Sequence, residues 1–219
     1  MRKIIIKSNK EAQVPVEALN KLRRAAFEQQ WAKDGLYFSM SDNEHFAQYL
    51  KDKVVFVAQD ETTGELLGMH TLKLNQRKHS VYGANLAITP SAKHEGIASR
   101  MLQEEVQRLK QRGYRYFIGA TGIPATWSVQ WHLKNGYHIV GYSRSEKQNY
   151  ASYLFRKQIA VDVRRHPIDL LWTKPIAPVT AKLQYAVTYL ATCICKDKAG
   201  KLNWIGRMAK DVRRLMSDG

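Results

Sequence analysis

The segment 86–98 holds the residue types best suited to chemistry in this chain. An apolar strand pattern ends at Ile88, the chain turns, and Gly96 and Ala98 open a helical pattern. Backbone N–H groups at a helix N-terminus bind phosphate, and small residues let the anion approach closely. Lys93 adds a positive charge. The pattern predicts an anion site, with an ordinary strand-to-helix turn as the alternative.

This segment resembles the acetyl-coenzyme A loop of the GNAT superfamily of N-acetyltransferases. That superfamily has Leu-x-Val-x-Pro-x-x-Gln/Arg-x-x-Gly-x-Gly/Ala at the end of its fourth strand. The residues in register are Leu86, Ile88, Pro90, Lys93, Gly96 and Ala98. Lys93 stands in the Gln/Arg position, where it keeps the charge but lacks the bidentate fork of arginine.

A second segment resembles the same superfamily, whose members carry Ala-x-x-Phe-Tyr-x-x-x-Gly-Phe on the helix after strand five. Residues 128–137 keep this spacing, with Trp131 and His132 in the Phe-Tyr positions and Gly136 before Tyr137. One helix pattern and one strand pattern separate the two segments, as in the superfamily.

The resemblance implies that a primary amine attacks acetyl-CoA directly, in a ternary complex with the protein. It implies a pantetheine arm between the splayed fourth and fifth strands, and no metal. Main-chain groups of Leu86, Ala87 and Ile88 would bind this arm. The residues expected around the pyrophosphate are Lys93, His94, Glu95, Gly96, Ile97, Ala98 and Ser99.

The departing thiolate needs a proton, and the superfamily usually supplies it from the tyrosine of the second segment. His132 occupies that position and is the candidate acid. The alternative is that His132 packs or binds the co-substrate. Ala125 replaces an asparagine common in the superfamily, which removes a polar contact.

No residue is predicted as the general base. We expect the Glu95 side chain to point to solvent. His70, His79 and Asn85 lie on or beside central strands and are expected to be polar residues with satisfied hydrogen bonds.

The periodicity predicts an α/β chain with a central mixed sheet, helices on both faces and a helical C-terminal extension. This arrangement is consistent with the acyl-CoA N-acyltransferase fold of the resemblance. The expected strands are 3–7, 53–59, 65–74, 80–89, 114–120, 137–142 and 150–157. The expected helices are 15–32, 41–50, 96–112 and 125–135.

Composition narrows the class of protein. The chain has 219 residues, 44% of them hydrophobic, and a net charge of +16, so a fully disordered chain is excluded and acidic partners are expected. Two cysteines, Cys193 and Cys195, cannot form a disulfide scaffold or a structural zinc site. No signal peptide or transmembrane stretch is visible. The expected location is the cytoplasm, or the periphery of a membrane.

The pattern divides the chain into an N-acetyltransferase domain, 1–158, and a basic helical extension, 159–219. The extension carries two apolar stripes at helical spacing. One interpretation is a helical pair that packs on the domain or on a second copy in a homodimer. The other is an amphipathic surface for anionic lipid or an acidic carrier protein.

Two functions besides acetyl transfer stay open. The first is an N-acyltransferase that takes a long acyl chain from an acidic acyl carrier protein. The second is a binding module for nucleic acid, suggested by the net charge and by Tyr114, Tyr116 and Phe117 beside Arg115. A strand directs some of these aromatic side chains into the core, which weakens this reading.

The acceptor amine cannot be read from the sequence. Trp31, Tyr37 and Trp127 are candidates for an acceptor pocket, and burial in the core is the commoner role of such aromatic side chains.

Overall fold

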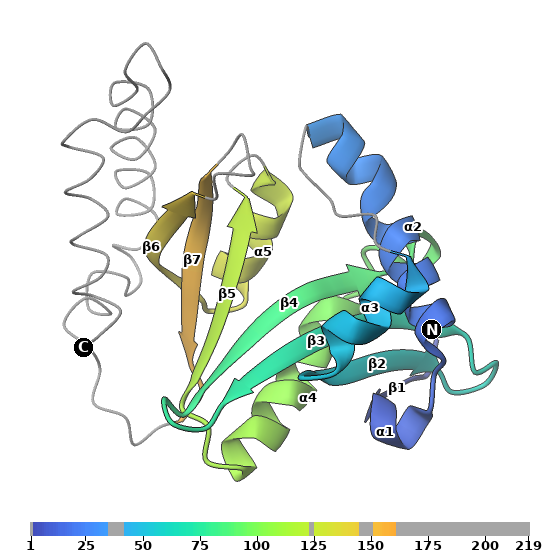
Figure 1. The fold of residues 1–219 in the computed structure, drawn as a ribbon, viewed down its shortest axis with the longest axis horizontal. Helices are drawn as coiled ribbons and strands as arrows, with labels where there is room; N and C mark the ends of the chain where they lie inside the picture. The colour runs from blue at the N-terminus through green and yellow to red at the C-terminus, as the bar shows by residue number, and fades with distance from the viewer. Residues whose placement is uncertain (1, 35–41, 123–124, 145–150, 161–219) are drawn as a thin grey trace. The chain divides into compact units, whose positions relative to one another are not determined.

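Seven strands form one mixed sheet, flanked by helices (Figure 1). The computed structural model describes residues 2–34, 42–122, 125–144 and 151–160. The strands are β1 (Ile4–Ser8), β2 (Val54–Asp60), β3 (Leu66–Asn75), β4 (Ser80–Ile88), β5 (Tyr116–Gly122), β6 (His138–Arg144) and β7 (Ala151–Gln158). The helices are α1 (Asn9–Ala12), α2 (Val16–Asp34), α3 (Asn43–Leu50), α4 (Ile97–Gln111) and α5 (Thr126–Lys134), with a 3-10 turn, η1, at Pro90–Ala92.

The strand order is β1-β2-β3-β4-β5-β7-β6. Neighbouring strands run antiparallel, except that β4 and β5 run parallel. A parallel pair requires a crossover connection, and α4 provides it. The parallel pair therefore lies in the middle of the sheet. Strand β4 leads into the loop before α4, and β5 follows the end of α4.

One face of the sheet packs against α2 and α3. The apolar stripe of α2 and the buried Phe46 of α3 contact alternate residues of β2, β3 and β4, because successive side chains of a strand point to opposite faces. The members of this cluster are Leu19, Leu22, Ala26, Phe27, Phe46, Val55, Val57, Met69 and Ala87.

The opposite face packs against α4 and α5. The buried residues of α4 are Ile97, Met101, Leu102, Glu105 and Leu109. Phe117 of β5 contacts Tyr137, which follows α5, and Tyr137 contacts His132 within α5. Helices α4 and α5 therefore cover the face of the sheet on which the His70 side chain lies. The Met69 side chain lies on the opposite face, against α2 and α3.

The predicted fold class and order of the longer elements are confirmed, with bounds that differ by a few residues. Two short elements were not predicted, namely α1 and the 3-10 turn. Asp42 is the N-cap of α3 and accepts a hydrogen bond from the His45 amide at 2.8 Å. The predicted helices of the extension and the boundary at 158 stay predictions, because residues 161–219 lie outside the described part.

Gly83 tests how tightly the sheet packs under α4. An added Cβ would lie 2.6 Å from Phe117 Cε1 and 2.8 Å from His70 Nε2, both in buried rings. We expect Gly83→Ala to lower the free energy of unfolding by about 1–3 kcal/mol in urea denaturation. Gly141→Ala is the control, since its Cβ would meet only Leu154 Cδ1 at 3.8 Å. Equal stability of the two variants would contradict the close packing.

Candidate functional site

The sheet opens between β4 and β5. Their pairing starts at Ser80 with Tyr116 and ends at Gly83 with Gly119, while β4 continues to Ile88. The two strands then diverge (Figure 1). Beyond Gly83, β5 supplies no hydrogen-bond partners to the main chain of β4 in the described residues. We call the point where pairing ends, at Gly83 and Gly119, the vertex.

A bulge lies in β4 just beyond the vertex. The β3–β4 register shifts between Met69 and Thr71, and Asn85 has φ 51. Asparagine tolerates this left-handed conformation better than most residues. The bulge gives the strand a local kink where it leaves β5.

A chain of hydrogen bonds holds this bulge. Asn85 Nδ2 donates to the Tyr49 hydroxyl at 2.9 Å, which lies 3.3 Å from Thr71 Oγ1. Thr71 Oγ1 donates to the Ala84 carbonyl at 2.6 Å. Tyr49 belongs to α3, so the network ties this helix to the bulge on the face away from α4. Asn85 is thus a satisfied polar residue, as the sequence suggested.

The loop between β4 and α4 has a group of backbone N–H groups next to the N-terminus of α4. Lys93 N donates to Pro90 O at 3.5 Å, and the helix starts after Gly96, which has φ 76. Within the described residues, the amides of residues 94–98 have no backbone acceptor. An added Cβ at Gly96 would meet no atom within 4 Å. This open group of amides at the positive end of a 15-residue helix can bind an anion.

The predicted co-substrate residues therefore form one continuous stretch, from the last residues of β4 to the first turn of α4. Ala87 faces the core between the sheet and α2, so only its main chain is available to a ligand. The side chain of Ile97 is also buried. Lys93, His94 and Glu95 are exposed, and Glu95 faces solvent as expected.

His132 lies on α5, on the other side of the vertex. Its ring stacks on Phe155 with centroids 4.4 Å apart and meets Trp131 and Tyr137 edge-on at 5.0 Å. Nδ1 lies 2.7 Å from the Ser128 carbonyl, so Nδ1 carries a proton and donates it. The pKa of His132 is lowered to about 4, chiefly by burial and to a smaller extent by the nearby His70, while the hydrogen bond to Ser128 acts in the opposite direction. At neutral pH the ring is uncharged, and Nε2 is a hydrogen-bond acceptor.

A second histidine shares this part of the structure. His70 of β3 is 5% exposed, and its Nδ1 lies 2.8 Å from Oε2 of Glu105, a fully buried residue of α4. The His70 ring stacks on Phe117 with centroids 5.8 Å apart. His70 was expected to be a satisfied polar residue, and its hydrogen bond to Glu105 fits that expectation. Glu105 was not predicted, although a glutamate within the apolar stripe of 96–112 was a visible signal.

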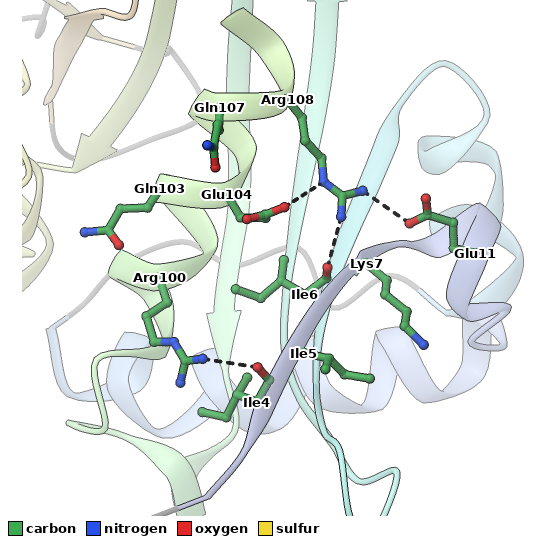
Figure 2. A pocket seen from close by; sticks show the side chains of 10 residues that line it. All are labelled: Ile4, Ile5, Ile6, Lys7, Glu11, Arg100, Gln103, Glu104, Gln107 and Arg108. Carbon is green, nitrogen blue, oxygen red and sulfur yellow. Dashed lines mark hydrogen bonds and ion pairs between the residues drawn. The ribbon is translucent and has the colours of Figure 1, made fainter. Parts of the chain in front are cut away.

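A groove of about 660 Å³ lies elsewhere, between α4 and the edge strand β1 (Figure 2). Arg100 donates to the Ile4 carbonyl at 3.1 Å, and Arg108 donates to the Ile6 carbonyl at 3.3 Å. These two side chains cover carbonyl groups of the sheet edge that would otherwise be open to another strand. We interpret the groove as the place where these arginine side chains protect the edge of the sheet. Strands β2 and β3 lie between it and β4.

The aromatic residues proposed for an acceptor pocket are only partly described. Trp127 is 40% exposed. The Trp31 side chain and Tyr37 lie outside the described residues. In the described part of the chain, no group of three or more His, Cys, Asp or Glu residues is placed to hold a metal ion.

The model of the acetyltransferase (GNAT) family matches residues 16–137, more than half of the chain. This chain belongs to that family and is an acyltransferase. The matched residues include the opening between β4 and β5, the loop before α4, and α5. No curated protein matches the chain.

Solved structures share the fold at low sequence identity. An N-acetyltransferase from Staphylococcus aureus Mu50 has TM-score 0.57 and 16% identity, and the match covers 72% of this chain and 99% of that one. The ribosomal-protein-S18-alanine N-acetyltransferase from Escherichia coli has TM-score 0.56 and 10% identity, with 76% and 99% covered. A GNAT family acetyltransferase from Elizabethkingia anophelis, with acetyl-CoA bound, has TM-score 0.53 and 17% identity, with 71% and 97% covered.

None of the described helices is both long enough and apolar enough to cross a membrane.

The lowered pKa of His132 has a consequence for stability. Between pH 6.5 and about 4 the unfolded chain binds a proton at this residue and the folded chain does not, so stability falls as the pH falls through that range. We expect the free energy of unfolding of His132→Phe, measured in urea titrations, to fall less over this pH range than that of wild type, because phenylalanine cannot titrate. His79→Gln, at an exposed histidine, should retain the wild-type dependence on pH. Identical pH profiles for wild type and His132→Phe would contradict the assignment.

Proposed function

We propose that this acyltransferase moves the acetyl group of acetyl-CoA to a primary amine by direct attack in a ternary complex. The observation that carries the proposal is the opening of β4 and β5 beyond Gly83, next to amides at the N-terminus of α4 that have no backbone acceptor among the described residues. An extended arm can pair with the β4 edge, and a diphosphate can bind the helix end.

The co-substrate residues are proposed from this arrangement together with the family pattern. Main-chain groups of 86–88 would bind the pantetheine arm. The pyrophosphate would lie against the amides of 94–98 and next to Ser99, whose amide donates to the Gly96 carbonyl at 3.1 Å. Lys93 would be an exposed cation beside it. The space next to Gly96 supports this fit, because no atom of the described residues would fill it.

In the reaction, the nitrogen lone pair of a neutral amine attacks the thioester carbonyl, and the sulfur leaves as a thiolate that needs a proton. Holding the two reactants side by side supplies much of the acceleration. His132 is proposed near the sulfur from its place in the family pattern. To act as the acid it needs a doubly protonated ring, because the neutral ring uses its one N–H on Ser128.

A long acyl chain delivered by an acidic acyl carrier protein is the second candidate. The net charge of +16 favours such a partner. Nucleic acid gains less support, because Tyr114 and Phe117 are buried and cannot stack on bases. Anionic membranes and a homodimer stay predictions that depend on the extension.

Calorimetric titration with acetyl-CoA at two salt concentrations tests the proposed site. We expect wild type to bind and Gly96→Glu to bind at least about 100-fold more weakly, since the new carboxylate repels the diphosphate. Gly113→Glu is a matched control at the other end of α4. It also has a left-handed φ, 81 against 76 at Gly96, and no neighbour within 4 Å. Both variants therefore carry similar backbone strain, and only the first should lose binding.

Binding by Gly96→Glu at wild-type affinity would contradict the assignment of the loop. Wild-type protein that ignores free acetyl-CoA and accepts the acyl group of an acyl carrier protein would support the second candidate instead.

A further inference from the structure

We propose that His70, paired with Glu105, donates the proton to the thiolate that leaves in the reaction. This inference rests on the proposed acetyl transfer and names a further catalytic residue for it. It is carried by the burial of the pair and by the place where the free nitrogen of His70 lies.

The buried pair favours a protonated His70. Glu105 is 0% exposed at its side chain, and His70 is 6% exposed. Oε2 of Glu105 bonds to Nδ1 of His70 at 2.8 Å, while Oε1 has no hydrogen-bond partner in the described residues. A buried carboxylate with so few partners is stabilised by a full positive charge next to it. An imidazolium supplies that charge, and its second proton is then on Nε2.

That second nitrogen lies at the vertex. A Cβ built on Gly83 would be 2.8 Å from His70 Nε2, and one built on Gly119 would be 3.1 Å from His132 Nε2. Gly83 and Gly119 are the last paired residues of β4 and β5. The two free ring nitrogens therefore lie over the two strands where the proposed arm would end.

The two histidines differ in what holds their Nδ1 atoms. Nδ1 of His70 faces a carboxylate, which stabilises a positive ring. Nδ1 of His132 faces a neutral carbonyl within an aromatic cage, which disfavours one. His70 is thus the proposed proton donor at the vertex, and His132, which is uncharged at neutral pH, is an acceptor.

The proposed step balances without any further reactant. The amine lone pair forms the C–N bond, the C–S bond breaks, and its electron pair passes to sulfur. The Nε2 proton of His70 moves to this sulfur and gives the thiol. The acceptor nitrogen releases one proton to solvent, and His70 regains one from solvent.

Two titratable groups of the described residues interact with His70, namely Glu105 of α4 and His132 of α5. Tyr137, after α5, interacts with Glu105 and contacts the His132 ring. Burial raises the pKa of Tyr137 well above its usual range, and Glu105 raises it further, so this group stays neutral. Deprotonation of Tyr137 therefore does not account for a loss of activity at high pH.

The first measurement is the protonation state of the rings, which needs no acceptor. Nitrogen NMR of histidine-labelled wild type at neutral pH should show the His70 ring protonated on both nitrogens and His132 protonated on Nδ1 alone. The spectra of His70→Gln and His132→Phe assign the signals. A neutral His70 ring would overturn the proposal.

The second measurement separates chemistry from binding. With hydroxylamine as the acceptor, thiol release by His70→Gln and Glu105→Gln should fall about 10²–10⁴-fold in kcat, with the Kd for acetyl-CoA unchanged. We expect the kcat of wild type to fall at high pH, and this fall should be absent from His70→Gln. His79→Gln, a change at an exposed histidine, should behave as wild type.

The remaining outcomes are distinguishable. If His132→Phe loses kcat and His70→Gln does not, the proton comes from His132 and the proposal fails. If His70→Gln lowers only the melting temperature, with kcat and its pH profile unchanged, the pair is structural and the proposal also fails. If wild type does not bind acetyl-CoA, the proposed function fails, whatever the state of the His70 ring.

Discussion

The parallel pairing of β4 with β5 stops at Gly83 and Gly119, and most of the site follows from that stop. Two parallel strands that stayed paired would leave no room for an extended ligand between them. Because they diverge, β4 keeps a free edge of main-chain groups that leads to the N-terminus of α4. The bulge at Asn85, held by Tyr49 and Thr71, fixes the direction in which β4 leaves its neighbour.

The glycines at the vertex are explained by the rings above them. A side chain at Gly83 would collide with His70 and Phe117, and one at Gly119 would press on His132. Small residues in the sheet thus allow two imidazole rings to approach the main chain at the place where the strands separate. Burying a polar ring in an apolar environment costs free energy unless the ring is hydrogen-bonded. The Glu105 carboxylate provides this hydrogen bond for His70, and the Ser128 carbonyl provides it for His132.

Local patterns predicted the parts of the fold and site that lie close together in sequence. The helical pattern over 96–112 predicted α4, and the loop before it was predicted from its small residues and their spacing. The His70–Glu105 pair could not be predicted in this way, since its members are 35 residues apart. Their meeting depends on the register of β3 with β4, which includes the bulge, and on which face α4 covers. Periodicity places Glu105 in the core, but it does not name the partner.

The surroundings of His132 decide whether its ring donates or accepts a hydrogen bond at the vertex. A neutral tyrosine at this position carries one O–H and can give its proton away, becoming a phenolate. A neutral histidine carries one N–H, and the carbonyl one helical turn earlier takes it, which leaves a lone pair facing the vertex. The exchange of tyrosine for histidine therefore turns a donor into an acceptor at neutral pH, unless burial is offset by a charge. The carboxylate that could offset it lies on α4, and it is bonded to His70. In the proposed reaction, the proton donor is thus set by which of the two rings is next to Glu105, the one buried carboxylate described at the vertex.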